Sequence, residues 1–120
     1  MLIAENDKDI RELVSFILES EGYEVQSCPY TLENLLIMEA DLILLDEWVN
    51  FKEGPMLCKE IKAIERLAHV PVIIFSTAPD IEQIAAACRA NGYVHKPFDL
   101  ETLLSEVRKF LPLDHVRARA

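Results

Sequence analysis

The chain has 120 residues, of which 51% are hydrophobic, and it carries a formal net charge of −9 at neutral pH. This length predicts a single folded domain, and this hydrophobic fraction excludes disorder over most of the chain. Because the surface is expected to be acidic, nucleic acid and anionic membranes are excluded as expected partners of this domain.

The sequence contains neither a membrane span nor a cysteine motif for metal binding. No apolar run approaches the roughly 20 residues that a membrane helix needs, and residues 1–15 lack the pattern of a signal peptide. Cys28, Cys58 and Cys88 form no CxxC pair and are predicted to be small core or surface residues in a reducing compartment. We therefore expect a soluble cytoplasmic protein.

The first part of the chain alternates strand and helix patterns. The apolar run 2–4 predicts a strand, and apolar residues at helical spacing over 10–18 predict a helix after it. Asp7 is expected to be the N-cap of this helix, and Gly22 to follow its end. A second strand is predicted around Val25. The short helical stripe after that strand consists of Leu32, Leu35 and Leu36, behind the expected N-cap Thr31.

Three more strands are predicted at Leu42–Leu45, Val72–Phe75 and Tyr93–Val94, each followed by a helical stripe. Asp80 and Asp99 are expected N-caps of the last two helices, and Gly92 is expected to follow the end of the fourth. The three stripes consist of Leu57, Ile61, Ile64 and Leu67, then Ile81, Ile84, Ala85 and Cys88, and finally Leu100, Leu103, Leu104 and Val107.

Strand and helix in regular alternation predict an α/β fold with parallel strands and helices on both faces of the sheet. Runs such as LILL and VIIF are typical of strands that are buried on both sides. In such sheets the functional crevice lies beyond the carboxyl ends of the strands. The residues that follow the strands are Glu5, Asn6 and Asp7, then Asp46 and Glu47, then Ser76 and Thr77, and finally His95, Lys96 and Pro97.

These residue types fit a divalent cation together with a phosphoryl group. Carboxylate oxygens bind a hard cation, while a hydroxyl and an ammonium group bind phosphoryl oxygens. Asp46 is the residue that directly follows a predicted buried strand, so we expect its carboxylate to lie in the crevice. Asp7 is more simply explained as a helix cap than as a ligand, and His95 is expected to point away from the crevice if Lys96 points into it.

The chain resembles the receiver domain of two-component response regulators over residues 1–112, which leaves residues 113–120 as a tail or the start of a linker. The resemblance is carried by LIAENDKDIREL, EGYEV, DLILLDEW with EGPMLCKEIK, PVIIFSTA and YVHKPFDLETLL, in that order. It implies a flavodoxin-like, doubly wound sheet of five parallel strands in the order 2-1-3-4-5 with five helices. It also implies a cis bond between Lys96 and Pro97.

The resemblance implies that Asp46 is the phosphoacceptor for a histidine kinase or phosphotransfer protein. The domain would then assist its own phosphotransfer and dephosphorylation rather than act as an enzyme on other substrates. Output would pass to an attached domain or an effector protein through the face made by the fourth helix, fifth strand and fifth helix. The implied roles are Mg²⁺ binding by Glu5, Asn6, Asp46 and the Trp48 carbonyl, phosphoryl binding by Lys96, Ser76 and Thr77, and switching by Ser76 and Tyr93.

Three positions depart from the family pattern. Asn6 stands where a second carboxylate is usual, which predicts weaker Mg²⁺ binding, while Thr77 replaces a small residue and Asn50 a proline. We favour a working but altered phosphoacceptor, and the alternative is a pseudo-receiver that acts as a phosphorylation-independent interaction module. A phosphatase of the haloacid dehalogenase type is disfavoured, because Trp48 stands where that chemistry needs a second aspartate.

Overall fold

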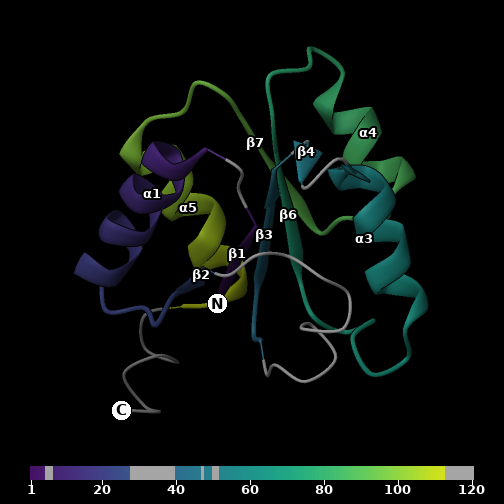
Figure 1. The fold of residues 1–120 in the computed structure, drawn as a ribbon, viewed down its shortest axis with the longest axis horizontal. Helices are drawn as coiled ribbons and strands as arrows, with labels where there is room; N and C mark the ends of the chain where they lie inside the picture. Colours follow the sequence, from purple (N-terminus) through teal and green to yellow (C-terminus); the bar gives the residue numbers. More distant parts are fainter. Residues whose placement is uncertain (5–6, 28–39, 47, 50–51, 113–120) are drawn as a thin grey trace.

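The computed structural model describes residues 1–4, 7–27, 40–46, 48–49 and 52–112 of the chain. Its centre is a parallel sheet with the strand order β2-β1-β3-β6-β7 (Figure 1). The strands are β1 (Leu2–Ala4), β2 (Gln26–Ser27), β3 (Ile43–Asp46), β6 (Val72–Ser76) and β7 (Gly92–His95). A separate antiparallel pair consists of β4 (Trp48–Val49) and β5 (Lys52–Glu53).

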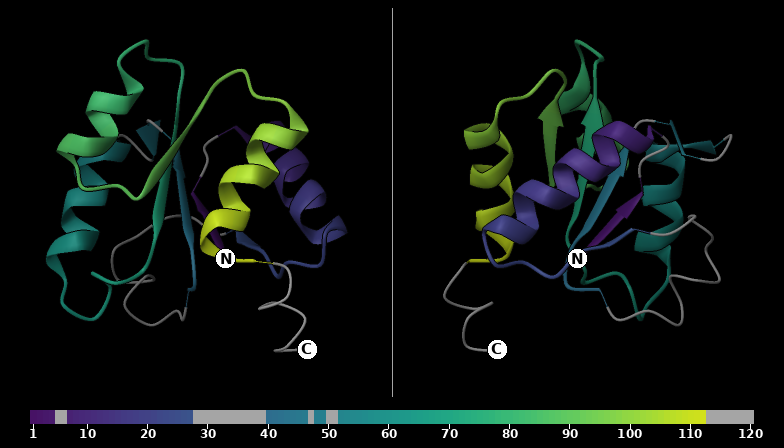
Figure 2. Two further views of the ribbon diagram at one scale, coloured as in Figure 1. Left: turned by 180° about the vertical axis from the view of Figure 1, so that it is seen from behind. Right: turned by 60° about the vertical axis from the view of Figure 1, so that its left-hand side comes forward.

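Helices cover both faces of the sheet. The helices α1 (Lys8–Ser20) and α5 (Leu100–Phe110) lie on one face, and α3 (Gly54–Ala63) and α4 (Ile81–Ala87) lie on the other (Figures 1 and 2). The predicted α/β class with a doubly wound parallel sheet is therefore confirmed. The predicted helical stripe through Leu32, Leu35 and Leu36, with its cap Thr31, lies outside the described residues, so the full set of five helices stays a prediction.

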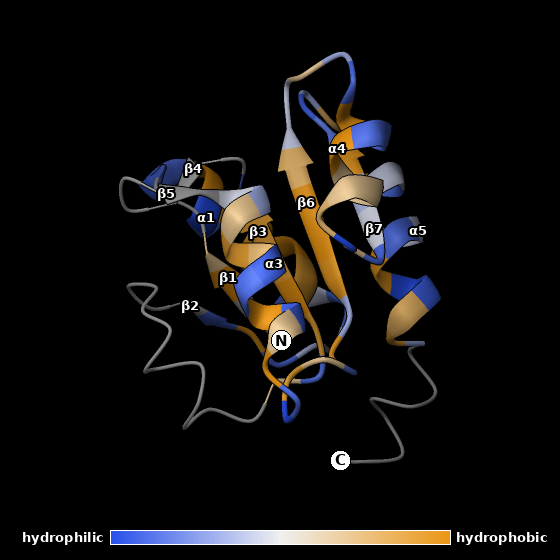
Figure 3. Ribbon diagram, turned by 90° about the vertical axis from the view of Figure 1, so that its right-hand side faces the viewer, coloured by the Kyte–Doolittle hydropathy of each residue, from blue (hydrophilic) through white to orange (hydrophobic). Residues whose placement is uncertain are grey.

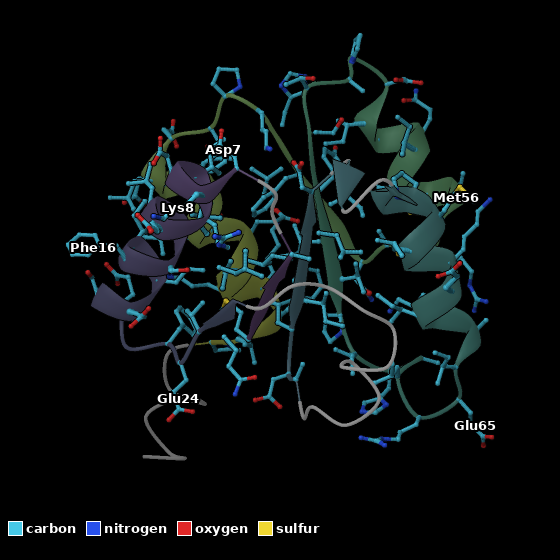
Figure 4. The ribbon with its side chains drawn as sticks, viewed as in Figure 1. Asp7, Lys8, Phe16, Glu24, Met56 and Glu65 are labelled. Atoms are coloured by element: carbon cyan, nitrogen blue, oxygen red, sulfur yellow. The ribbon has the colours of Figure 1, made fainter. Side chains whose placement is uncertain are left out.

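The core consists of two clusters, one on each face of the sheet. Alternate residues of β3 and β6 point to opposite faces, and both faces are covered, which is why both strands are apolar up to their last residue (Figure 3). Met56 and Phe16, by contrast, point away from the sheet on opposite sides of the molecule (Figure 4). Ile43, Leu45, Val72 and Ile74 pack towards α3 and α4, whereas Leu44, Ile73 and Phe75 pack towards α1 and α5.

Two of the predicted N-caps are confirmed by hydrogen bonds. The Asp7 carboxylate accepts from the backbone N–H groups of Asp9 at 2.9 Å and Ile10 at 3.1 Å, and it lies at the start of α1 (Figure 4). The Asp99 carboxylate accepts from the Thr102 N–H at 2.7 Å. Asp80 occupies the N-cap position of α4, but its side chain makes no capping hydrogen bond.

The predicted end of α1 is also confirmed. Gly22 has a φ of 100°, a left-handed conformation that glycine adopts without steric cost. The Tyr23 N–H donates to the Leu18 carbonyl at 3.1 Å, and the Gly22 N–H donates to the Glu19 carbonyl at 3.0 Å. This pair of bonds closes the helix as a Schellman motif.

The apolar stripe from Leu57 to Leu67 extends beyond the end of the helix α3. The α-helix ends at Ala63, although the apolar spacing continues to Leu67. Beyond Ala63 the chain continues in turns whose hydrogen bonds span three residues, such as Leu67 N–H to the Ile64 carbonyl at 2.9 Å. Leu67 is nevertheless buried, because residues three apart lie on the same side in this tighter geometry.

The predicted role of Gly92 at the end of α4 is wrong. Gly92 is the first residue of β7, and the left-handed position after α4 is taken by Arg89, with a φ of 66°. The Ala90 N–H closes this end by donating to the Ala85 carbonyl at 2.9 Å. The space beside Gly92 is limited by α5: a Cβ there would lie 2.5 Å from Oε1 of Glu106 and 3.2 Å from the Phe110 ring, so these side chains would have to shift to admit it.

Replacing Arg89 with glycine is expected to stabilise the domain. A left-handed residue with a Cβ costs roughly 1 to 2 kcal/mol, and the greater freedom of glycine in the unfolded chain offsets part of that gain. We expect the free energy of unfolding, measured by urea denaturation, to rise by about 0.5 to 1 kcal/mol. Arg89→Ala is the matched control, since it removes the same charge but keeps the Cβ; an equal rise in that variant would contradict the backbone explanation.

Candidate functional site

The carboxyl ends of β3, β6 and β7 lie next to one another at one edge of the sheet (Figure 1). The strand register pairs Asp46 with Phe75 and Ser76 with His95, so β6 and β7 end level with each other and one residue beyond the level of Asp46. Asp46 and Ser76 are both buried at this edge, with 8% and 2% of their surfaces exposed. Sequence reasoning predicted this convergence, and the structure brings these residues together.

Asp46 and Lys96 form an ion pair across this edge. The Lys96 Nζ donates to Asp46 Oδ1, and the two side chains are only 15% and 10% exposed. Asp46 ends β3, and Lys96 directly follows β7, so the pair joins two strands that are separated in the sheet by β6. Because the pair is largely shielded from water, its attraction is screened less than that of a surface pair. The predicted ion pair between Lys96 and Asp46 is confirmed.

Ser76 is tied to both of its neighbouring segments. Its Oγ accepts from the Ala78 N–H at 3.0 Å, and its carbonyl accepts from the Lys96 N–H at 2.8 Å. The first bond sets the start of the loop between β6 and α4, and the second fixes the residue that follows β7. Thr77, next in the chain, is exposed at the mouth of the site.

The segment after β7 is held by an aromatic contact that sequence reasoning missed. The Lys96–Pro97 peptide bond is cis, as the resemblance implied. Phe98 then packs on Phe75, with ring centroids 5.6 Å apart. Since Phe75 is the register partner of Asp46, this contact anchors the lysine-bearing segment beside the carboxylate. The sequence did show Phe98 directly after Pro97, but it did not show that Phe98 packs on Phe75.

The other predicted residues occupy different positions relative to the site. The backbone of Trp48 lies in β4, two residues beyond Asp46. Tyr93 lies on β7 with 38% of its surface exposed, between buried neighbours. His95 is exposed while Lys96 is partly buried, as expected from the alternation along a strand. Glu5 and Asn6, the two remaining predicted metal ligands, lie outside the described residues, as do Glu47 and Asn50.

The oxygen donors at this edge are of the kind that Mg²⁺ prefers. The Asp46 carboxylate and the Trp48 main-chain carbonyl follow the same strand, and carboxylate and carbonyl oxygens suit a hard cation. Within the described ranges, no group of three or more His, Cys, Asp or Glu residues could hold a metal ion, and two of the four predicted ligands lie outside those ranges. The two predicted ligands that the structure describes, the Asp46 carboxylate and the Trp48 carbonyl, are oxygen donors of the type that suits Mg²⁺.

A model of the response regulator receiver domain matches residues 1–108 of the chain. The chain belongs to this receiver-domain family. Among the described residues of this receiver domain, no helix has both the length and the apolar character needed to cross a bilayer.

Several curated relatives are longer than this receiver domain, and one has nearly its length. The DNA-binding dual master transcriptional regulator RpaA of Synechocystis is 32% identical over 116 residues, which cover 92% of this chain and 48% of RpaA. The sporulation initiation phosphotransferase F of Bacillus subtilis is 29% identical over 94% of both chains. The receiver domain thus spans about half the length of several of the curated relatives that it matches.

Solved structures agree with the fold. The chemotaxis response regulator CheY4 of Vibrio cholerae is 27% identical over 92% of this chain and 96% of its own, with a TM-score of 0.82. The receiver domain of a signal transduction histidine kinase from Syntrophus aciditrophicus has a TM-score of 0.83 and the same identity, over 92% of this chain and 87% of its own. A chemotaxis response regulator and the receiver domain of a histidine kinase are therefore both similar in fold to this chain.

Proposed function

We propose that this receiver domain accepts a phosphoryl group on Asp46 from a phosphohistidine of a histidine kinase or phosphotransfer protein. The observation that carries this proposal is the shielded ion pair between Asp46 and Lys96, with Ser76 buried at the same sheet edge. A carboxylate, an ammonium group and a hydroxyl from three strand ends are the groups that a transferred phosphoryl needs.

The transfer exchanges one bond to phosphorus for another. An Asp46 carboxylate oxygen attacks the phosphorus, the P–N bond of the phosphohistidine breaks, and the imidazole leaves with a proton. The Lys96 ammonium screens the repulsion between the two anions and then follows the charge to a phosphoryl oxygen. Attack by water on the same phosphorus would return Asp46 to its free form, so the domain would also limit the lifetime of its own signal.

Magnesium would supply additional charge neutralisation at the attacking and transferred oxygens. Asp46, the Trp48 carbonyl, Glu5 and Asn6 are the residues proposed to hold it. Asn6 offers a neutral amide oxygen where a carboxylate would add a negative charge, so binding is expected to be weak.

Replacing Asn6 with aspartate, which adds a negative charge, is expected to strengthen Mg²⁺ binding. Because each added carboxylate contributes a full charge beside a dication, Asn6→Asp is expected to raise Mg²⁺ affinity by about tenfold or more. The measurement is a titration with Mg²⁺ followed by Trp48 fluorescence, since Trp48 is the only tryptophan in the chain. Asn50→Asp adds the same charge at another position in the chain and serves as the control; an equal gain in that variant would show a general charge effect.

Phosphorylation is proposed to change the packing around Ser76 and Tyr93. The Ser76 hydroxyl would donate to a phosphoryl oxygen and draw the loop before α4 inward, which opens space for the exposed Tyr93 ring. The face made by α4, β7 and α5 would shift as a result and pass the signal to a partner. Two recipients of the signal are proposed. One is an output domain that follows residues 113–120, since relatives such as RpaA are about twice as long as the matched region, and the other is a separate effector protein.

Incubation with acetyl phosphate and Mg²⁺, followed by intact mass measurement, tests the proposal. We expect an increment of about 80 Da, the mass of one added phosphoryl group, that is absent in Asp46→Asn. Asp41→Asn is the matched control, since it removes an aspartate from the opposite end of the same strand segment and should keep the increment. No increment at any Mg²⁺ concentration would overturn the phosphoacceptor proposal and leave a domain that acts through its surface alone.

A further inference from the structure

An open groove runs along the outer side of α1. Residues of this helix from Arg11 to Ser20 line it together with Val25, which follows the turn after the helix, and its volume is about 530 Å³. Sites that hold small ligands have volumes in this range. Its lining does not include Asp46 or Lys96, so the groove is separate from the candidate phosphoryl site.

The groove presents an aromatic ring to water. Phe16 is 72% exposed and points out from α1, away from the sheet (Figure 4). Leu13, one turn earlier on the same helix, is 55% exposed, and Val25 is half-buried. Because burial of apolar surface is favourable, a segment with apolar side chains would be stabilised by covering this ring.

The rim of the groove is rich in carboxylates. Glu12 and Glu19 line it and are exposed, and Glu24 is exposed in the segment that leads to Val25. Lys8 pairs with Glu12 at 3.7 Å, but their side chains are 74% and 63% exposed, and so exposed a pair contributes little. An occupant that combines apolar side chains with positive charge therefore fits this groove.

The end of α5 is fixed close to the groove. The buried Tyr23 hydroxyl donates to the Leu111 carbonyl, and Arg108 donates to Glu21 at 3.2 Å. Both bonds join the last turn of α5 to the turn that follows α1, and Val25 lies just beyond that turn (Figures 1 and 2). The chain that follows Leu111 therefore begins beside one end of the groove.

We propose that residues 113–120, here called the tail, dock in the α1 groove as an extended segment that covers Phe16. The tail has the sequence LDHVRARA, in which Val116 and two alanines alternate with Arg117 and Arg119. In an extended segment, alternate residues point to opposite sides. The apolar side then lies on Phe16, while the long arginine side chains reach the carboxylates on the rim.

The tail is long enough for this contact. Its residues span up to about 26 Å when extended, whereas α1 between Glu12 and Ser20 spans only about 12 Å. Because an attached segment is held at an effective concentration of about a millimolar, a contact with a Kd near that value is formed about half of the time. Docking therefore requires only a weak contact.

The docked tail has one consequence that rests on the proposed function. An output domain attached through the tail, which is one of the two proposed recipients of the signal, would start from the α1 side of the receiver domain. The docking itself does not depend on phosphorylation. The chain that carries Asp46→Asn is therefore expected to show the same contact, so the two proposals can fail separately.

A spin label at the end of the tail tests the docking. In the full chain, Ala120→Cys combined with Cys28→Ser takes one label, because Cys58 and Cys88 are buried. The amide signals of the isotope-labelled protein then report which residues the label approaches, and mass measurement checks that one label is present.

We expect the amide signals of Glu12 and Ser15 to lose intensity, since both residues lie towards the end of the groove that is farther from Leu111. Lys59 on α3, on the other face of the sheet, should keep its signal. Raising the salt concentration from about 0.1 M to about 1 M shortens the screening length from about 10 Å to about 3 Å and should reverse much of the loss.

Charge exchange separates docking from mere nearness of the label. Arg117→Glu with Arg119→Glu should restore the signals, and adding Glu12→Arg with Glu19→Arg should bring the loss back. Circular dichroism checks that each variant is folded. An equal loss in the chain with reversed tail charges would overturn the proposal. So would a loss that arises only when a spin-labelled chain is mixed with an isotope-labelled one, because a second copy would then occupy the groove.

Discussion

Replacing Lys96 with methionine is expected to slow phosphotransfer to Asp46 by about 100-fold or more, the usual effect of removing one preorganised charge from a transferring group. The ammonium group is the only cation that the described residues show in contact with the Asp46 carboxylate. Without it, a second anion would approach Asp46 with only the proposed Mg²⁺ as a screen, and Asn6 is expected to weaken the binding of that ion. Mass measurement of the phosphorylated fraction against time with acetyl phosphate gives the rate.

The same substitution should also lower stability, and the two effects can be separated. Breaking a fully buried ion pair costs about 3 to 5 kcal/mol, and the partial exposure of this pair reduces the expected loss to about 2 kcal/mol. Adding Asp46→Asn to Lys96→Met should recover most of that loss in urea denaturation, because no charge is then left without a partner. Lys96→Arg keeps the charge and is expected to retain stability; an equal loss in that variant would point to packing instead.

Lys62→Met is expected to lower the free energy of unfolding by about 2 to 4 kcal/mol, because hydrogen bonds from a charged donor to buried acceptors contribute about 1.5 to 3 kcal/mol each. The Lys62 Nζ donates to the Val70 carbonyl at 2.8 Å and to Asn91 Oδ1 at 2.7 Å, with a longer bond to the Ala68 carbonyl. Asn91 Oδ1 in turn accepts from the first residue of β6, so one lysine joins α3, the turn after it and the start of β7.

Two comparisons test this explanation. Lys59→Met changes an exposed lysine on the same helix and should shift the free energy of unfolding by less than about 0.5 kcal/mol. Burial also lowers the pKa of Lys62, so the unfolded chain holds this proton more tightly than the folded domain does. The contribution of Lys62 to stability should then increase as pH rises towards 10.5, the ordinary lysine value. A difference between wild type and Lys62→Met that shrinks over that range would contradict burial as the cause.

Several features of this receiver domain were predictable because their causes are local. Asp7 caps a helix through N–H groups two and three residues away, and the N–H groups of Gly22 and Tyr23 close that helix through bonds to residues three and five positions before them. The apolar runs of β3 and β6 predicted strands that are covered on both faces. Once parallel strands were inferred, Asp46, Ser76 and Lys96 had to meet, since the carboxyl ends of parallel strands share one edge.

Other features depended on which segments pack together. Lys62 and Lys59 are both lysines on α3, yet only Lys62 is buried, because the acceptors that satisfy it come from Val70 and Asn91. Gly92 was assigned to a helix end on local grounds, but it begins β7 and lies close to the side chain of Glu106 on α5.

The sequence by itself determined the order of strands and helices and the residues at the strand ends, because hydrophobic period and capping act over a few residues. Only the tertiary structure decided that Cys58 and Cys88 lie in one buried cluster, that Phe98 packs on Phe75 and that a lysine lies in the core. Such contacts join residues that are distant along the chain, and a side chain's partner there is set by the packing of whole elements rather than by its neighbours in sequence.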